Sequence, residues 1–237
     1  MSLDIQKPRH IAITPDGNRR WAREKGVDIS MGHFAGYEKI KEVIGWANDR
    51  VIECLTIWGL SRENVLKRDE KEKEGLFKLI NNLTDLLPLL QERNTKFINI
   101  GDIRLFPLET QKLLMGIEEE TKDNEGMKLA IALGYSGLDE IIRAINRRID
   151  AGYGNKHINE TELTKYSDGG LDIPDPDLSI RTGIHNGTDC TRHSGIHLAK
   201  STHTEYLNHK ILWPDYTEEQ FDIDLQEFSK TKRTKGK

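Results

Sequence analysis

Apolar positions along the chain follow two spacings. Short runs rich in β-branched and other apolar residues predict buried strands at residues 10–14, 51–58, 95–101, 127–135 and 177–183. Elsewhere apolar residues recur at three- and four-residue steps, which is typical of one helix face. These stretches predict helices at residues 32–50, 76–90, 107–121, 138–149 and 217–230. Strand followed by helix, repeated, predicts an α/β fold with a central, mostly parallel sheet flanked by helices.

The predicted helix at residues 76–90 has the strongest apolar stripe. The stripe consists of Leu76, Leu79, Ile80, Leu83, Leu86, Leu87 and Leu90. Pro88 lies inside this pattern, where its ring removes a backbone donor and crowds the preceding turn. We therefore expect the helix to be kinked or shortened there.

The length of 237 residues suits one large domain or two small ones. No linker rich in Pro, Gly or Ser divides the chain, so we expect a single domain over residues 1–237. The net charge of −4, from 35 basic and 39 acidic residues, argues against a nucleic-acid-binding protein. Residues 230–237 are strongly basic and are expected to form a disordered, solvated tail. Weak attraction of this tail to an anionic membrane surface is the alternative.

The cysteine content and the length of the apolar runs bear on the compartment. Two cysteines, Cys54 and Cys190, cannot form a disulfide framework. No apolar run is long enough to span a bilayer, and no signal peptide precedes the first strand. We therefore expect a cytoplasmic protein.

Polar side chains follow the predicted strand ends. The first strand leads into Asp16, Gly17, Asn18, Arg19 and Arg20. Ser61 and Asn64 follow the second strand, and Arg181 ends a late one. Open α/β sheets bind ligands where the carboxyl ends of their strands meet. Arginines and glycine-exposed N–H groups suit phosphate, and one carboxylate suits Mg²⁺ shared with that phosphate. The pattern predicts a phosphate and metal site at a strand-to-helix turn.

A simpler interpretation of the same residues stays open on composition and spacing alone. Asp-Gly-Asn is also ordinary turn chemistry, Arg20 could pair with Asp16 on the surface, and Trp21 could belong to the core. The chain has neither a P-loop nor a dinucleotide-binding glycine motif. The residues by themselves thus indicate a phosphate-binding α/β enzyme of unknown reaction.

The stretch HIAITPDGNRRWA at residues 10–22 resembles the first signature of the cis-prenyltransferases, the undecaprenyl diphosphate synthase family. The likeness continues with GHFAG at 32–36, GLSREN at 59–64, PDPDLSIRTG at 174–183, and Glu205 before WPDY. These motifs cover nearly the whole chain in the family's order. The resemblance implies a sheet flanked by helices with a hydrophobic tunnel, whose wall would include the helix at 76–90.

The resemblance also implies a reaction and the residues that carry it. An allylic diphosphate would lose diphosphate with the help of Mg²⁺, and isopentenyl diphosphate would capture the cation to leave a cis double bond. Asp16 and Asn64 would be catalytic, and Asp16 with Glu205 would hold Mg²⁺. The implied substrate-binding residues are Gly17, Asn18, Arg19, Arg20, Trp21, His33, Ser61, Arg181, Arg192 and Ser194. A homodimer is expected, with peripheral membrane contact through the lipid product.

The sequence departs from the family's pattern on both substrate sides. Ile29 stands where the family usually carries an arginine, four residues before His33. Val65 replaces the aromatic that commonly follows the asparagine, and Lys67 replaces the arginine two residues further on. A lysine keeps the charge but cannot bind phosphate in the bidentate way of a guanidinium. We expect weaker diphosphate contacts at these positions.

The segment after Arg181 is changed more strongly. An inserted loop at residues 184–191 separates Arg181 from Arg192 and Ser194, and GIHLAKSTHT replaces the usual aromatic, apolar segment. The acceptor side is therefore rebuilt more than the donor side. The acceptor could be another isoprenoid diphosphate or an alcohol instead of isopentenyl diphosphate.

The rebuilt segment is rich in histidine. Cys190, His193 and His197 have a spacing that could bind zinc. No fourth ligand is evident, and solvated loop histidines are the interpretation that we favour. His10, by contrast, is expected to be structural.

The sequence leaves two alternatives to a prenyltransferase. The chain could be a non-catalytic partner subunit of a heteromeric synthase, but such partners typically lose the catalytic aspartate, and Asp16, Arg20, Asn64 and Glu205 are present. A phosphatase or another phosphate-binding enzyme remains only if the family resemblance is accidental.

Overall fold

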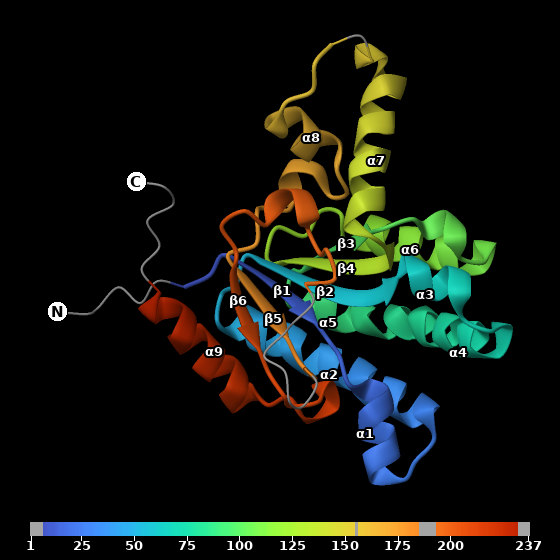
Figure 1. Ribbon diagram of the computed structural model, residues 1–237, viewed down its shortest axis with the longest axis vertical. Coiled ribbons are helices and arrows are strands. Elements are labelled where there is room, and N and C mark those ends of the chain that lie inside the picture. The colour runs from blue at the N-terminus through green and yellow to red at the C-terminus, as the bar shows by residue number, and fades with distance from the viewer. Residues whose placement is uncertain (1–6, 155, 185–192, 232–237) are drawn as a thin grey trace.

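The centre of the molecule is a parallel sheet of six strands (Figure 1). The computed structural model describes residues 7–154, 156–184 and 193–231. The strands are β1 His10–Thr14, β2 Cys54–Ser61, β3 Lys96–Ile100, β4 Lys128–Tyr135, β5 Leu178–Arg181 and β6 Glu205–Asn208. Their order across the sheet is β3-β4-β2-β1-β5-β6, and every pair is parallel. The predicted α/β class is confirmed, whereas β6 was not predicted.

The strand order changes direction at β1. On one side of β1 lie β2, β4 and β3 in that order, and on the other side lie β5 and β6. Thr14 at the end of β1 pairs with Arg181 at the end of β5. The carboxyl ends of β1 and β5 therefore meet at the switch point, which is where open α/β sheets bind ligands.

Helices surround the sheet. They are α1 Asn18–Lys25, α2 Ile29–Asp49, α3 Arg62–Lys67, α4 Glu70–Asn81, α5 Leu87–Glu92, α6 Leu108–Thr121, α7 Gly137–Arg148, α8 Glu160–Tyr166 and α9 Glu218–Lys230. The helices predicted at residues 32–50, 107–121, 138–149 and 217–230 correspond to α2, α6, α7 and α9. Helix α1 confirms the helix expected at the strand-to-helix turn after the first strand. The short helices α3 and α8 were not predicted, because few turns leave little periodicity to detect.

The predicted helix at residues 76–90 is divided into three pieces. Helix α4 ends at Asn81, a 3₁₀ turn covers Asn82–Leu86, and α5 begins at Leu87 with Pro88 in its first turn. Proline is tolerated in that first turn because its missing N–H would have no helical partner there. The expected interruption at Pro88 is confirmed.

The two faces of the sheet have different cores. One face is packed by α2, α6 and α9, and its strands contribute large apolar side chains such as Ile13, Ile57 and Ile131. On the other face, the central strands β2 and β4 carry small residues such as Cys54, Ala130 and Ala132. The second face therefore leaves room for polar side chains from a later segment.

A buried polar chain on that second face joins two histidines through Thr56. His10 Nδ1 lies 2.7 Å from the Pro174 carbonyl oxygen and so donates to it, which leaves its Nε2 to accept from Thr56 Oγ1 at 2.8 Å. The Thr56 oxygen in turn accepts from His197 Nε2 at 2.9 Å. His10 is structural, as predicted. His197 is buried, so the expectation of a solvated loop residue was wrong for it, because this segment folds onto the sheet.

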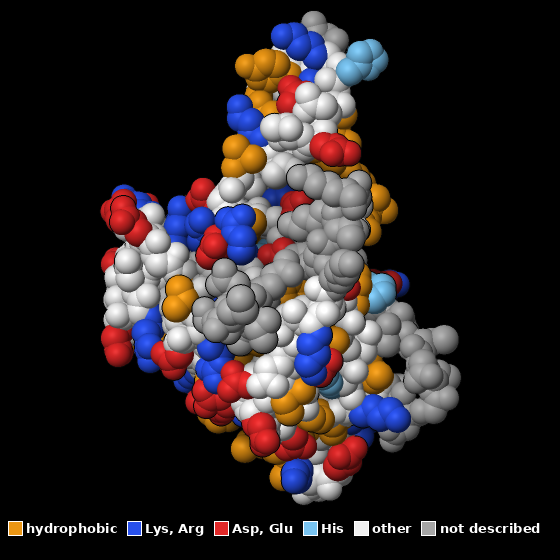
Figure 2. Space-filling view, turned by 90° about the vertical axis from the view of Figure 1, so that its left-hand side faces the viewer, with side chains coloured by type: hydrophobic (Ala, Val, Ile, Leu, Met, Phe, Trp, Pro, Cys, Tyr) orange, Lys and Arg blue, Asp and Glu red, His pale blue; other side chains and the backbone are white. Residues whose placement is uncertain are grey.

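Helices α7 and α8 form an arm that rises from the sheet (Figure 1). Along α7 and just beyond it, Leu138, Ile142, Ile145 and Ile149 are exposed. Figure 2 shows charges of both signs interspersed over the face that carries α9. No helix among the described residues is long and apolar enough to cross a membrane.

The predicted tail falls almost wholly outside the described residues. Lys230 still belongs to α9 and pairs with Glu227 at 2.6 Å. Residues 232–237 are not described. The tail as predicted therefore begins at least one residue too early, because the helix continues through Lys230.

Candidate active site

The backbone of Asp16 is held against the end of β5. Its N–H donates to Thr182 Oγ1 at 3.0 Å, and the same hydroxyl donates to the Asp16 carbonyl oxygen at 3.1 Å. Gly183 adopts a φ of 64°, and a Cβ there would lie 2.4 Å from the Asp16 carbonyl oxygen. Only glycine fits so close an approach, so these contacts place the Asp16 carboxylate at the switch point.

Two guanidinium groups flank the Asp16 carboxylate. Arg181 Nη2 donates to Oδ2 at 2.8 Å, and Arg20 Nη2 donates to Oδ1 at 3.1 Å. Arg20 also donates to the Gly183 carbonyl. The Asp16 side chain remains 39% exposed. The Arg20–Asp16 pair does form, but it belongs to a larger charged cluster that is open to solvent.

The turn after Asp16 brings α1 against α2. Gly17 has a φ of 110°, and a Cβ on it would lie 2.8 Å from Leu212 Cδ2. Helix α1 then begins at Asn18. A Cβ on Gly32 would lie 2.2 Å from the Asn18 carbonyl oxygen, and one on Gly36 would lie 2.6 Å from its Oδ1. The two glycines of GHFAG thus let α1 approach α2 closely.

His33 offers an unused nitrogen beside this turn. Its Nε2 is buried and has no hydrogen-bond partner among the described residues. Burial, and then the nearby Arg68 guanidinium, lower the pKa of the imidazole. The ring is therefore neutral at pH 7 and can interact with a bound group.

A polar cavity of about 950 Å³ opens at these strand ends. Its lining includes Asp16, Gly17, Asn18, Arg19, Arg20, His33, Ser61, Asn64, Arg68, Arg181 and Ser194. Nearly all the predicted site residues that the structure describes thus share one cavity. The predicted convergence of the strand ends is therefore present in the fold.

An apolar groove of about 790 Å³ adjoins the polar cavity. It runs between the start of α2 and α4, and its apolar lining is Ile29, Met31, Phe34, Leu76 and Leu79. Arg19, His33 and Leu76 line both spaces. A molecule with an anionic head and a hydrocarbon tail would therefore fit across the junction.

Ser61 and Asn64 are positioned by the start of α3. Ser61 caps this helix, and its Oγ accepts from the Asn64 N–H at 3.1 Å. Arg181 Nη1 donates to Ser194 Oγ at 2.7 Å, so Ser194 also reaches the charged cluster. Ser61, Asn64 and Ser194 thus add short, neutral hydrogen-bonding groups to the charged lining of the cavity.

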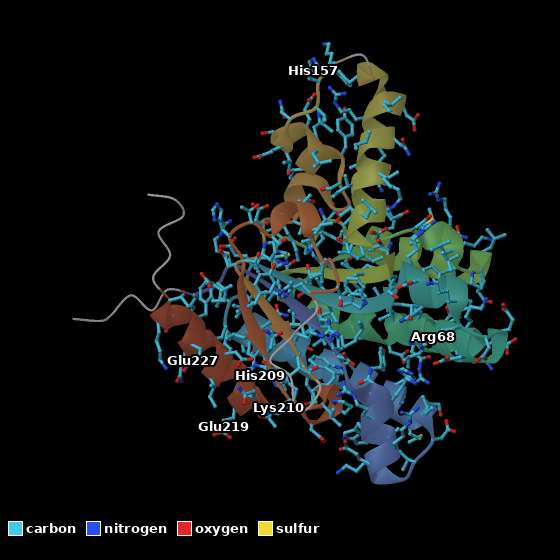
Figure 3. The ribbon with its side chains drawn as sticks, in the orientation of Figure 1. Arg68, His157, His209, Lys210, Glu219 and Glu227 are labelled. Carbon is cyan, nitrogen blue, oxygen red and sulfur yellow. The ribbon has the colours of Figure 1, made fainter. Side chains whose placement is uncertain are left out.

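Arg68 is a candidate that the sequence reasoning missed. Lys67, the residue expected at this place, is 74% exposed and pairs with Glu63. Arg68 is only 17% exposed, lines the polar cavity, and donates to Glu72 Oε1 at 2.9 Å. Figure 3 labels it beside α4. The extended backbone of Arg68 ends α3, and Asp69 then caps α4, a signal that was readable in the sequence.

Two predicted residues lie away from the cavity. Trp21 donates from its indole nitrogen to Asp215 Oδ1 at 2.8 Å and lines neither space. Glu205 is the first residue of β6 and pairs with Leu178, the first of β5. Because parallel strands share one polarity, Glu205 lies at the amino end of the sheet, opposite Asp16. The predicted metal pair is not brought together within this chain.

The remaining predicted residues belong to the rebuilt segment. Arg192 and Cys190 lie outside the described residues. The ring of His193 lies 4.1 Å from that of Tyr206, whereas His197 faces Thr56. The described part of the chain holds no group of three His, Cys, Asp or Glu side chains placed to bind a metal.

Known proteins similar to this chain include isoprenyl transferases and undecaprenyl diphosphate synthases. A family model described as putative undecaprenyl diphosphate synthase matches residues 14–236. An isoprenyl transferase 1 of Corynebacterium diphtheriae is 34% identical, over 98% of this chain and 88% of its own. A tritrans,polycis-undecaprenyl-diphosphate synthase (geranylgeranyl-diphosphate specific) of Pyrobaculum aerophilum is 33% identical, over 100% and 99%.

Two solved structures share the fold along the whole chain. Lavandulyl diphosphate synthase from Lavandula x intermedia, in complex with dimethylallyl diphosphate, has a TM-score of 0.87 at 28% identity, covering 98% of this chain and 99% of its own. A probable undecaprenyl diphosphate synthase from Campylobacter jejuni has a TM-score of 0.80 at 26% identity, covering 98% and 100%.

Proposed function

Because this chain belongs to the undecaprenyl diphosphate synthase family of prenyltransferases, we propose that it moves an isoprenoid chain from an allylic diphosphate to an acceptor. The usual acceptor would be isopentenyl diphosphate, and the new double bond would be cis. The observation that carries the proposal is the Asp16 carboxylate between Arg20 and Arg181, in a polar cavity that opens onto an apolar groove. Each part of an allylic diphosphate has a matching surface there.

The allylic diphosphate is expected to lie at the start of α1. Backbone N–H groups at a helix N-terminus attract phosphate oxygens, and Arg19, Arg20 and Arg68 add charge-assisted donors. The free Nε2 of His33 would meet the same head group. The hydrocarbon tail would then extend along the groove between α2 and α4.

The transfer breaks the C–O bond of the allylic carbon, and the electron pair leaves with the diphosphate. With isopentenyl diphosphate as the acceptor, its double bond attacks the resulting cation, and a proton then passes to the released diphosphate or to water to give the new alkene. Arginines fixed in the cavity before reaction stabilise the charge that develops on the leaving diphosphate. Asn64, with Ser61, is proposed to position the reacting end of the acceptor.

Magnesium fits this site in one respect. Asp16 supplies a half-exposed hard oxygen donor, and Mg²⁺ is commonly held by one or two carboxylates together with substrate phosphates. When bound, Mg²⁺ would neutralise the departing diphosphate. The metal proposal rests on Asp16, since a single chain does not bring Glu205 to the same end of the sheet.

The acceptor side carries the larger departures from the family's pattern, and a non-standard acceptor is part of the proposal. Arg181 and Ser194 line the cavity on this side. The insertion at residues 184–191 separates Arg181 from Ser194, and a solved relative was captured with dimethylallyl diphosphate. Both points support testing a second allylic diphosphate, as well as an alcohol, as acceptor.

Product analysis by mass spectrometry tests the proposal. Purified protein with Mg²⁺ would receive dimethylallyl, geranyl, farnesyl or geranylgeranyl diphosphate, with and without isopentenyl diphosphate. New prenyl products support prenyl transfer, and none with any pair would contradict it. A micromolar KM for isopentenyl diphosphate, together with long all-cis products and no reaction with alternative acceptors, would contradict the non-standard acceptor alone.

A non-catalytic partner subunit is the alternative, and the assembled cluster of Asp16, Arg20 and Arg181 disfavours it. Activity of the purified chain by itself would exclude that alternative.

We also propose a homodimer, supported by the exposed apolar residues Leu138, Ile142 and Ile149 along the arm. A single domain, a cytoplasmic location and peripheral membrane contact through the lipid product complete the proposal.

A further inference from the structure

A carboxylate bridges two arginines at the junction of the polar cavity and the apolar groove. Glu72 Oε1 accepts from Arg68 Nη1 at 2.9 Å and lies 3.8 Å from Arg19 Nη1. Arg68 lines the polar cavity, Glu72 lines the apolar groove, and Arg19 lines both. The bridge therefore spans the passage from α4 to α1 that a bound prenyl diphosphate would have to cross.

The local charge at this bridge favours an incoming anion. Two guanidiniums face one carboxylate, and the neighbouring His33 is neutral, because burial and then Arg68 lower its pKa. The bridge of Arg19, Arg68 and Glu72 by itself thus keeps a net positive charge when Glu72 is ionised. The Nε2 of His33 has no partner among the described residues, so the junction also holds an unsatisfied polar atom.

The two halves of the bridge differ in strength. The Arg68–Glu72 bond is short, and the two side chains are 17% and 26% exposed. The Arg19–Glu72 contact is longer, and Arg19 is 47% exposed, so water screens it. Arg19 is therefore the partner that can leave Glu72 at little cost.

We propose that Glu72 is a counter-charge that pairs with both guanidiniums in the absence of substrate, and that its contact with Arg19 is released when a diphosphate binds across the junction. The carboxylate keeps the two guanidiniums together when the site holds no anion, and it competes with the ligand for Arg19. Removing its charge should therefore tighten diphosphate binding. This inference rests on the proposed function for the identity of the substrate, but not for the binding of diphosphate itself.

Calorimetric titration with inorganic pyrophosphate tests the inference on the full chain. We expect Glu72→Gln to bind pyrophosphate about fivefold more tightly at low salt, since an exposed ion pair is worth up to about that factor. The gain should shrink as salt is added, because salt screens the competing charge. Glu70→Gln is the matched control, since Glu70 pairs with Lys73 and lines neither space. It should change the affinity by less than twofold.

The outcomes separate this inference from the proposed function. Unchanged or weaker pyrophosphate binding by a folded Glu72→Gln protein would overturn the competing role and would mean that Glu72 only orients Arg68. Tighter binding would uphold the inference even if no prenyl transfer were detected. Wild-type protein that fails to bind pyrophosphate would overturn the inference, whereas the proposed function is decided separately by the product analysis.

Discussion

Asp16 Oδ2 lies 2.8 Å from Arg181 Nη2, so the side chain that ends β5 holds the carboxylate that follows β1. The two residues are far apart in the sequence and meet only because β1 and β5 are neighbours at the switch point of the sheet. An oxyanion bound there would meet Arg181 and Arg20 together. Asp16 lies between these two cations and is the carboxylate proposed to hold Mg²⁺. Catalysis is therefore expected to depend most steeply on Asp16.

Replacing Asp16 by alanine should abolish prenyl transfer without unfolding the protein. The side chain is half-exposed, and the Thr182 contacts use only the Asp16 backbone. Loss of a group that acts in the transition state costs several kcal/mol, so kcat should fall by about 10³-fold or more. Asp215→Asn, outside both cavity linings, is the control. Near-normal turnover by folded Asp16→Ala would refute the assignment.

Arg68 and Lys67 make a matched pair of adjacent cations. Arg68→Ala should lower kcat/KM for the allylic diphosphate by about 10- to 100-fold, the value of a charge-assisted hydrogen bond. Lys67→Ala should have less than a twofold effect, because Lys67 is exposed and pairs with Glu63. Steady-state kinetics with varied allylic diphosphate measures both. Equal losses in the two variants would mean that the cation nearest the substrate had been misidentified.

Chelation should stop the reaction reversibly. With EDTA we expect loss of activity and an unchanged circular dichroism spectrum, and Mg²⁺ alone should restore turnover without refolding. The reason is that Asp16 and diphosphate are hard oxygen ligands at the surface of a preformed cavity. Stoichiometric zinc in the purified protein, lost together with structure on chelation, would point to the cysteine- and histidine-containing segment instead.

Stability should fall below neutral pH because of the buried His10 and His197. Burial is the main cause that lowers the pKa of His10 to about 4 and also lowers the pKa of His197. Between pH 6.5 and about 4 the unfolded chain binds protons that the folded chain does not. The free energy of unfolding therefore drops in that window, by about 1.4 kcal/mol per pH unit for each neutral buried histidine.

Urea unfolding across that pH range measures this slope. His197→Gln should reduce the pH dependence even if it also lowers the overall stability. His157→Gln is the control, since Figure 3 shows His157 at the tip of the arm and its side chain is exposed. An identical slope in wild type and His197→Gln would show that the His10–Thr56–His197 chain does not control acid stability.

The sequence by itself determined the architecture and the main part of the site. Helix and strand periodicities are local properties, so the repeated strand–helix pattern predicted a parallel α/β sheet. The strand-end rule then placed Asp16, Ser61, Asn64 and Arg181 at one edge, where the structure also has them. Pro88 predicted the break between α4 and α5 for the same local reason.

Only the tertiary structure decided which strand end a carboxylate occupies and that Arg68, not Lys67, lines the cavity. Asp69 marks the start of α4 in the sequence, but the exposures of the two cations, 17% for Arg68 and 74% for Lys67, follow from how α3 and α4 pack. The pairing of β6 with β5 puts Glu205 at the amino end, and the fold of the later segment buries His197 against Thr56. Strand pairing and side-chain direction depend on contacts between residues distant in the chain, and the periodicity of one segment carries no information about them.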